Sequence, residues 1–423
     1  MPVCISPMGG GAQVIRPEST QHFQAITRGT QARPPQPYVD SIVGGHVAWV
    51  KSRPDAPRWN QYVSFNAPAR NKLSCSMDLS HPQGIQLFKR LIAVSDVMVE
   101  NNSPRVIESL GLSYEALKQV KPDLIMVSMP GFGLTGPYRN YRCIGPHQEG
   151  FIGHTYLRGY PNEELDTNVT VFHIDEAAGV AATLAVLTAL HYRNRTGKGQ
   201  FIELTQTEAT IPQLGEAVMD CIMNGRVHQR IGNRDVHGAI QGCYRCKGSL
   251  KPADVTPGQD KWVNITIRTD QEWQRFCGAA GHPEWASDER FAGQLSRLKN
   301  HDVVDGLIGG WTIQHDHYAI MHQLQREGVP AGPVMDEAAV YSDHHLKERG
   351  FFERLTQADC GTHLYPGLAW KMSKMPNKLR LPPCRLGEHN EYVYKQVLGV
   401  SDEEYARLVA EGYLGTDYAP SIP

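Results

Sequence analysis

The sequence predicts an α/β protein whose main sheet is parallel and covered by helices. From Leu73 to Gly133, short apolar runs alternate with amphipathic stretches of helical period, which is the pattern of strand–helix–strand units. A chain of 423 residues is also too long for one small core. We therefore expect more than one domain, with the parallel sheet in the larger one.

The elements of this sheet follow one another closely after a first stretch with little pattern. Residues 1–70 are rich in Pro, Gly and Gln and predict only one short strand, at 12–15. No glycine-rich strand–turn–helix opens the chain, so no phosphate-binding loop is expected there. The regular pattern then predicts strands at 74–80, 96–101 and 122–133, and helices at 81–95, 103–112 and 113–121. Ser103 followed by Pro104 is typical of a helix start.

A β-branched run at 171–174 leads into a helix whose residues 177–190 are almost all apolar. A helix that is apolar on every side belongs in a protein interior. Its positively polarised end should therefore lie at the edge of a core, with Asp175 as its first residue. From the local sequence alone, Asp175 is either an N-cap or a functional carboxylate.

The second half of the chain predicts a separate, smaller unit. After residue 200 we expect a strand that passes into one long helix, then a polar loop up to Gly242. A strand at 262–267 begins the second unit, whose short helices over 271–325 share an apolar face. That face carries Trp273, Trp285 and Trp311.

The last part of the chain begins with a predicted rigid linker at Gly328–Pro333, because Pro and Gly interrupt helices and strands alike. Short strands are expected after His345, and a final helix over 401–411.

Composition excludes several classes of protein. With 42 basic and 44 acidic residues, nothing indicates binding to nucleic acid or to an anionic membrane surface. The sequence has no run of roughly 20 apolar residues, its first 20 residues lack the basic-then-apolar pattern of a secretory leader, and its nine cysteines lack regular spacing. These features predict a cytoplasmic protein with reduced thiols.

The motifs of the chain, in order and spacing, resemble the family III CoA-transferases from about Gly11 to Gly412. They are DVMVEN at 96–101 with Pro104, SLGLSYEAL at 109–117, GFGLTGPY at 131–138, DEAAG at 175–179, RTGKGQ at 195–200, CYRCKG at 243–248, GVPAGPV at 328–334 and LGEH at 386–389. The resemblance implies a Rossmann-like large domain built from both chain ends, a smaller α+β middle domain and an interlocked dimer. The implied boundaries are 1–205 for the first part of the large domain, 206–248 for a linker helix and lid loop, 249–327 for the small domain, 328–344 for a linker and 345–423 for the return.

The same resemblance implies a chemistry for Asp175. In the family, the matching aspartate attacks an acyl-CoA thioester and forms a mixed anhydride, which CoA then converts to an aspartyl-CoA thioester. Coenzyme A is a substrate here, so no permanently bound cofactor and no metal are expected. His344 and His345 do not change this expectation, because adjacent side chains point apart and no third ligand is suitably spaced.

Two further features have alternative interpretations. The loop from Gly232 to Gly242 matches the family's lid over the aspartyl intermediate through Gly232, Gly238 and Gly242, or it is an ordinary interdomain loop. Glu149 is an auxiliary group that orients the anhydride or an acceptor, or it is a solvated loop glutamate.

The sequence departs from the family pattern at the expected CoA site. The family's first strand–turn–helix unit has no counterpart here, so the large domain is expected to be N-terminally truncated. Family positions that bind the CoA nucleotide are replaced by Ser19, Ser80, Asn102 and Ser109. Losing charge-assisted hydrogen bonds of roughly 1.5–3 kcal/mol each would weaken CoA binding strongly.

We therefore expect a paralogous subunit that binds CoA, in a heterodimer or heterotetramer. This arrangement is similar to the two-subunit enzymes that transfer CoA from succinyl-CoA to aryl-substituted succinates such as benzylsuccinate. One alternative is a non-catalytic subunit that completes its partner's active site. An α-methylacyl-CoA racemase is disfavoured, because the stretch from Arg142 to His147 lacks the His-Asp pair that such racemases need, and His147 is expected to be hydrogen-bonded locally.

Overall fold

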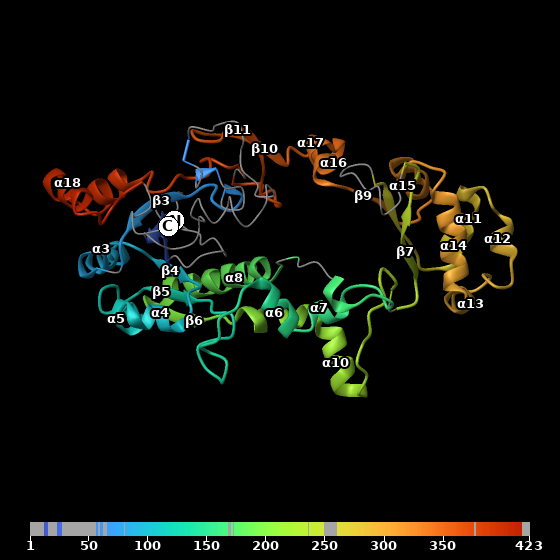
Figure 1. The fold of residues 1–423 in the computed structure, drawn as a ribbon, viewed down its shortest axis with the longest axis horizontal. Coiled ribbons are helices and arrows are strands. Elements are labelled where there is room, and N and C mark those ends of the chain that lie inside the picture. The colour runs from blue at the N-terminus through green and yellow to red at the C-terminus, as the bar shows by residue number, and fades with distance from the viewer. Residues whose placement is uncertain are drawn as a thin grey trace. The chain divides into compact units, whose positions relative to one another are not determined.

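The computed structural model describes residues 12–15, 23–27, 56–57, 60–61, 66–79, 81–167, 171, 173–235, 237–248, 260–375 and 378–416 (Figure 1). The chain divides into two compact units. We call the unit made of residues 1–154, 169–226 and 352–423 the large unit. Residues 155–168 and 227–351 form the small unit.

A six-stranded mixed sheet lies at the centre of the large unit. Its strand order is β3-β2-β1-β4-β5-β6. The strands are β1 (Ala12–Ile15), β2 (Phe23–Thr27), β3 (Leu73–Met77), β4 (Val97–Glu100), β5 (Ile125–Ser128) and β6 (Gln200–Glu203). β2 and β3 are parallel, as are β4, β5 and β6, but β1 runs antiparallel to both of its neighbours. The prediction of a wholly parallel sheet is therefore wrong at β1, because residues 16–22 are too few for the crossover that parallel neighbours need.

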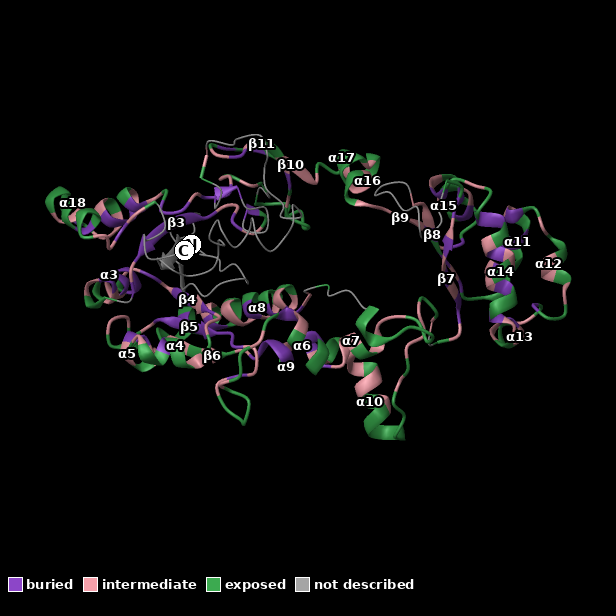
Figure 2. Cartoon of the chain, in the orientation of Figure 1, coloured by how far each residue is buried: buried purple, intermediate pink, exposed green. Residues whose placement is uncertain are grey.

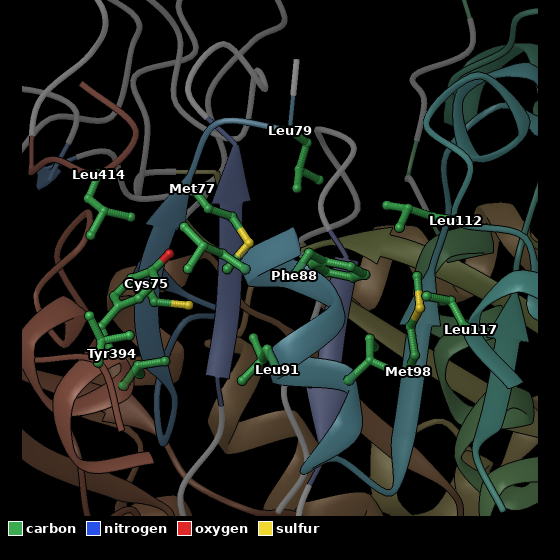
Figure 3. Close-up of a cluster of buried hydrophobic side chains, with 14 of the residues drawn as sticks. Cys75, Met77, Leu79, Phe88, Leu91, Met98, Leu112, Leu117, Tyr394 and Leu414 are labelled. Carbon is green, nitrogen blue, oxygen red and sulfur yellow. The ribbon is translucent and has the colours of Figure 1, made fainter. Parts of the chain in front are cut away.

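One face of this sheet packs on α3 (Pro82–Ala93), which buries Leu87, Phe88 and Leu91. Successive strand side chains point to opposite faces, so Met98 and Met126 belong to this core while their neighbours face away. Figure 3 shows Cys75 and Met77 of β3 in the same cluster as Tyr394 and Leu414 from the end of the chain. Segments that are far apart in the sequence thus share one hydrophobic core.

The other face packs on α8 (His173–Thr196) through small side chains. Ala178 and Ala182 contact Val127, and Ala189 contacts Val97 and Ile125. At the far end of the helix, buried Arg193 forms an ion pair with Asp96, 2.8 Å between Nη2 and Oδ1, and a longer one with Asp123. These contacts fix the direction in which the helix meets the sheet.

The opposite face of α8 contradicts the prediction that this helix is buried on all sides. Val180, Leu184 and Leu187 are 73%, 68% and 58% exposed. Figure 2 shows that α8 carries exposed as well as buried residues. Alanines allow the helix to approach the sheet closely, whereas these three larger apolar side chains face outward and no described residue covers them. By length and composition alone, α8 is the one described helix that could cross a membrane, a criterion that core helices of soluble proteins also meet.

Shorter helices complete the described part of the large unit. They include α4 (Pro104–Ser109), α5 (Tyr114–Lys118), α6 (Gly145–Phe151), a π-helix (Tyr392–Val397) and α18 (Asp402–Ala410), alongside the hairpin of β10 (Phe352–Gln357) and β11 (Gly361–Pro366). Ser103 precedes α4 as predicted, although its side chain makes no capping hydrogen bond. The single long helix predicted after residue 205 is instead α9 (Gln206–Thr210), a 3-10 turn (Ile211–Leu214) and α10 (Gly215–Asn224). Pro212 explains the interruption, because it cannot donate the hydrogen bond that a continuous helix requires.

The small unit is a three-stranded antiparallel sheet covered by helices. The sheet order is β7 (Ile240–Arg245), β8 (Trp262–Ile267) and β9 (Ala331–Val334). The helices are α11 (Asp270–Ala280), α12 (Glu284–Ser287), α13 (Gln294–Lys299), α14 (His301–Thr312) and α15 (His317–Arg326), followed by α16 (Glu337–Ser342) and α17 (His344–Glu348). Trp273 and Trp311 are buried in its core and Trp285 packs against them, as predicted. The predicted linker at Gly328–Pro333 is partly wrong, since its second half forms β9, an edge strand where Pro333 costs no essential ladder bond.

Candidate active site

Asp175 lies in the first turn of α8, which begins at His173. The helix therefore starts two residues before the predicted position, and Asp175 is inside the turn instead of capping it. Its side chain is half-buried where α6, α8 and α9 pack against one another. The free backbone N–H groups of the first turn give this end of the helix a positive potential, which favours negative charge on Asp175 and on groups attached to it.

One oxygen of Asp175 is held by a chain of two side-chain amides. Gln206 donates from Nε2 to Asp175 Oδ1 at 3.3 Å, and its Oε1 accepts from Gln148 Nε2 at 2.7 Å. Gln148 and Gln206 are both buried. Among the described residues, none donates a hydrogen bond to Asp175 Oδ2. The two oxygens of the carboxylate are therefore not equivalent.

The backbone after β5 fixes where these amides lie. Gln206 N–H donates to Pro130 O at 3.2 Å, and Thr207 donates to Gly131 O from both its backbone N–H and its hydroxyl. A Cβ atom on Gly131 would collide with Cys143 Sγ and lie 2.7 Å from Gln148 Nε2. The first glycine of the GFG segment thus leaves room for Gln148 beside the loop.

Burial sets the charge state of the site. The pKa of Asp175 is raised to about 6, because burial and, to a smaller extent, the nearby Glu176 carboxylate raise it by more than the Gln206 hydrogen bond lowers it. Burial, together with the charge of Asp175, also raises the pKa of the Cys143 thiol. At neutral pH the carboxylate is mostly ionised while the thiol stays protonated, so Asp175 is the stronger nucleophile of the two.

Glu149 is fully buried in α6, so the interpretation as a solvated loop glutamate is wrong. Its Oε1 lies 3.3 Å from His173 Nδ1, and its Oε2 accepts from Val171 N–H at 3.4 Å. Ligand atoms of Glu149, His154 and His173 all lie within 4.8 Å of one another, a spacing that a metal ion could use. Because both carboxylate oxygens already have hydrogen-bonding partners, we assign Glu149 to anchoring the start of α8. The expectation of no metal stays a prediction.

The glycines of the predicted lid belong to the small unit and differ in their roles. Gly232 and Gly238 have left-handed backbone angles, with φ of 64° and 91°. Gly242 is not in a loop: it lies in β7, where a Cβ would collide with the Tyr244 side chain. Tyr244 in turn donates to Asp305 Oδ1 at 2.7 Å. The absence of a side chain at Gly242 thus serves packing inside the small unit.

The positions expected to have lost CoA contacts have local partners where they are described. Asn102 donates to Glu100 Oε2 from its backbone N–H at 2.8 Å and from Nδ2 at 3.2 Å. Ser109 is exposed and donates to Val106 O at 2.9 Å. Ser19 and Ser80 lie outside the described residues. Neither Asn102 nor Ser109 carries a positive charge that would bind a phosphate group of CoA.

Sequence reasoning identified Asp175 and Glu149 but missed Gln148 and Gln206. A signal existed, because Gln206 follows the carboxyl end of a strand in the parallel half of the sheet, where ligand sites commonly form. His147 is hydrogen-bonded locally as predicted, since its Nδ1 accepts from Ile144 N–H at 3.3 Å.

Comparisons with known proteins agree on one family. The family model of CoA-transferase family III matches residues 11–390. The beta subunit of succinyl-CoA–L-malate CoA-transferase from Chloroflexus aurantiacus is 32% identical over 344 residues, 81% of this chain and 82% of that protein. The alpha subunit from the same organism is 30% identical over 351 residues, 83% of this chain and 79% of that protein. A CaiB/BaiF family protein from Brucella suis superposes with a TM-score of 0.70 and 28% identity, covering 80% of this chain and 84% of that one.

Proposed function

Because the chain belongs to CoA-transferase family III, we propose that it transfers CoA from succinyl-CoA to a carboxylic acid, as one subunit of an enzyme with two kinds of subunit. The family shows that the protein is a CoA-transferase. We propose the succinyl-CoA donor, the assembly from two kinds of subunit and the carboxylic acid acceptor. The observation that carries it is the carboxylate of Asp175, held by one oxygen at the start of a helix with a pKa of about 6.

The proposed reaction begins when Asp175 Oδ2 attacks the thioester carbon of succinyl-CoA and CoA leaves as the thiolate. The product is a mixed anhydride between succinate and Asp175. The thiolate then attacks Cγ of Asp175, the Cγ–Oδ2 bond breaks, and succinate leaves with that oxygen. The acceptor carboxylate attacks the resulting aspartyl-CoA thioester and releases the thiolate again. This leaves a second anhydride, between the acceptor and Asp175. Finally the thiolate attacks the acyl carbon of the acceptor, the bond from that carbon to the bridging oxygen breaks, and Asp175 is released as a carboxylate.

The choice of donor is supported by relatives whose names include succinyl-CoA together with L-malate or D-citramalate. Those acceptors are small dicarboxylic acids, and an aryl-substituted succinate such as benzylsuccinate is the larger member of the same chemical class. We therefore propose a dicarboxylic acid as the acceptor.

A paralogous partner subunit is supported by two observations. Two relatives are the alpha and beta subunits of one kind of enzyme. In addition, α8 exposes Val180, Leu184 and Leu187, and α10 exposes Met219, Ile222 and Met223. Apolar patches of this kind on a protein surface are typical of subunit interfaces. We propose that the partner covers the α8 face and supplies the principal CoA site.

The proposal is tested by purifying the tagged full chain with its co-expressed family III paralogue and supplying succinyl-CoA with [14C]succinate. Exchange of label into succinyl-CoA is expected only when both chains are present, because the partner is proposed to supply the principal CoA site. Labelled succinate acts as the acceptor, so the exchange uses every step of the cycle and does not require the natural acceptor to be known. A panel of L-malate, D-citramalate, glutarate and benzylsuccinate then identifies the acceptor. Absence of exchange in the two-chain preparation would contradict the proposed function.

The rate of this exchange is expected to fall as the pH drops through about 6, since only ionised Asp175 attacks the thioester and its pKa is raised to about 6. An ordinary aspartate would lose its charge near pH 4. A profile of the exchange rate at subsaturating succinyl-CoA between pH 4.5 and 8, at about constant ionic strength, distinguishes the two. A rate that stays nearly constant from pH 8 down to pH 5 would contradict the burial of Asp175 as the controlling effect.

A further inference from the structure

Building on the proposed function, we infer that Gln206 is a catalytic residue that stabilises negative charge on Asp175 Oδ1, and that Gln148 is a positioning residue that orients the Gln206 amide. Gln206 contacts the reacting carboxylate directly, whereas Gln148 acts only through Gln206.

The geometry distinguishes the two oxygens of Asp175 before any reaction. Oδ1 accepts the Gln206 amide at 3.3 Å, whereas no described residue donates to Oδ2. Oδ2 accepts no hydrogen bond from a described residue, so its lone pairs are more available than those of Oδ1. Oδ2 therefore forms the bond to the donor acyl carbon. Oδ1 then stays the carbonyl oxygen of Asp175 in both the anhydride and the aspartyl-CoA thioester.

Negative charge therefore develops on Oδ1, the atom that accepts the hydrogen bond from the Gln206 amide. When CoA thiolate attacks Cγ of the anhydride, the carbonyl electron pair moves onto Oδ1 before Oδ2 departs with succinate. When the acceptor carboxylate attacks Cγ of the thioester, the pair moves onto Oδ1 again before the thiolate departs. A fixed N–H donor at Oδ1 therefore stabilises both of these tetrahedral intermediates. The first step is different, since its negative charge develops on the oxygen of the donor acyl group.

The second amide supplies the orientation. A free glutamine amide can turn either its NH2 group or its oxygen toward Asp175, and only the NH2 group stabilises an anion. Gln148 donates to Gln206 Oε1 at 2.7 Å and thereby fixes the oxygen away from Asp175. Gln148 is 1% exposed and Gln206 is 7% exposed, so water does not readily replace either partner. Gly131 contributes by leaving room for the Gln148 amide.

The test uses the two-chain enzyme, succinyl-CoA and [14C]succinate, with Gln206→Leu, Gln148→Leu and Gln148→Glu variants. Gln206→Leu is expected to lower the exchange rate by roughly 10²-fold, the effect of removing one oxyanion donor. An ionised carboxylate only accepts hydrogen bonds, so Gln148→Glu turns the Gln206 amide around and presents its oxygen to Asp175. We expect Gln148→Glu to lower the rate as much as Gln206→Leu does, and Gln148→Leu to lower it less.

A second measurement separates catalysis from simple loss of structure. After rapid mixing with succinyl-CoA and an acid quench, the intact mass distinguishes a succinylated chain from one that carries CoA. Gln206→Leu is expected to form the succinylated chain at nearly the wild-type rate and to accumulate it, because only attack on Cγ is slowed. The double variant Gln148→Glu with Gln206→Leu should be no slower than Gln206→Leu alone, since Gln148 acts through Gln206.

Gln323→Leu in α15 serves as a control, because it removes a comparable amide hydrogen bond, to Ala279 O, in the small unit. It should leave exchange unchanged. If wild-type enzyme gives neither exchange nor a modified chain, the proposed function itself is wrong. If wild-type enzyme reacts and Gln206→Leu matches it in exchange and in mass profile, the proposed function stands and the role of Gln206 is wrong. Equal slowing of succinylation and exchange would overturn the assignment of Oδ1 as the site of charge.

Discussion

Replacing Asp175 by Asn is expected to lower the exchange between succinyl-CoA and [14C]succinate by at least about 10³-fold, as removal of a nucleophile commonly does. The side chain keeps its size, and its Oδ1 can still accept the hydrogen bond from Gln206 Nε2, which is 3.3 Å away in the wild-type site. Only the attacking oxygen is lost. The two-chain enzyme is the material, and the initial rate of label exchange is the measurement.

The same variant should not be less stable than the wild type at pH 7. The pKa of Asp175 is raised in the folded chain to about 6, mainly by burial, so the ionised form is less favourable there than in the unfolded chain. That cost is fully present above about pH 6 and disappears as the pH falls toward the ordinary pKa of aspartate. Neutral asparagine avoids it, so the melting temperature is expected to stay the same or to rise. Activity would then fall without any loss of stability, which separates a nucleophile from a structural group.

Glu176→Gln provides the matched control, since it neutralises the adjacent, exposed carboxylate in the same helical turn. The Glu176 charge raises the pKa of Asp175, so this control should keep its activity and shift the acid limb slightly downward in pH. Full exchange activity in the Asp175→Asn enzyme would instead favour the alternative of a non-catalytic subunit that completes the active site of its partner.

The elements with a clear repeating pattern were predictable from sequence because each is specified locally. The short apolar runs of β4 and β5 and the amphipathic α3 appear where expected. Asp175 could be located too, because a polar residue between a strand-like run and an apolar helix is conspicuous. Glu149 was identified as a residue of interest, but its burial was not, since burial depends on how α6 packs against α8.

What could not be predicted depends on contacts between distant segments. Gln148 and Gln206 are far apart in the sequence, and neither has a local pattern that indicates a hydrogen bond between them. The antiparallel course of β1 depends on which strand it pairs with, and its own four residues do not determine that. The strand β9 was mistaken for a linker because Gly and Pro disfavour strands in general, although an edge strand tolerates both.

The exposed side of α8 illustrates the same limit, because composition alone indicated a helix buried on every side. Its buried alanines face the sheet, whereas Val180, Leu184 and Leu187 face outward. Leaving Val180, Leu184 and Leu187 in water forgoes the free energy that burial of each side chain would provide, roughly 1.5–3 kcal/mol. A partner that covers them would recover that energy, which is why we assign this face to the second subunit.

Leu184→Glu is therefore expected to disrupt the complex with the paralogous subunit. Leu184 is 68% exposed in the chain alone, so a glutamate there should leave the folded chain intact. In the complex the same carboxylate would be buried without a partner, at a cost of about 3–5 kcal/mol, which corresponds to roughly 10²- to 10⁴-fold weaker association. Sedimentation velocity of the purified pair across a dilution series measures the association, and circular dichroism of the isolated chain measures the fold.

Leu295→Glu is the matched control, because Leu295 in α13 is 74% exposed and lies in the small unit. The chemical change and the exposure are closely similar, so both variants should unfold at the same temperature as the wild type. Only the α8 variant should lose the partner and, with it, the exchange activity. Loss of activity with unchanged association would instead indicate that the α8 face acts on the site of Asp175 within its own chain, and equal association of both variants would place the subunit contact elsewhere on the molecule.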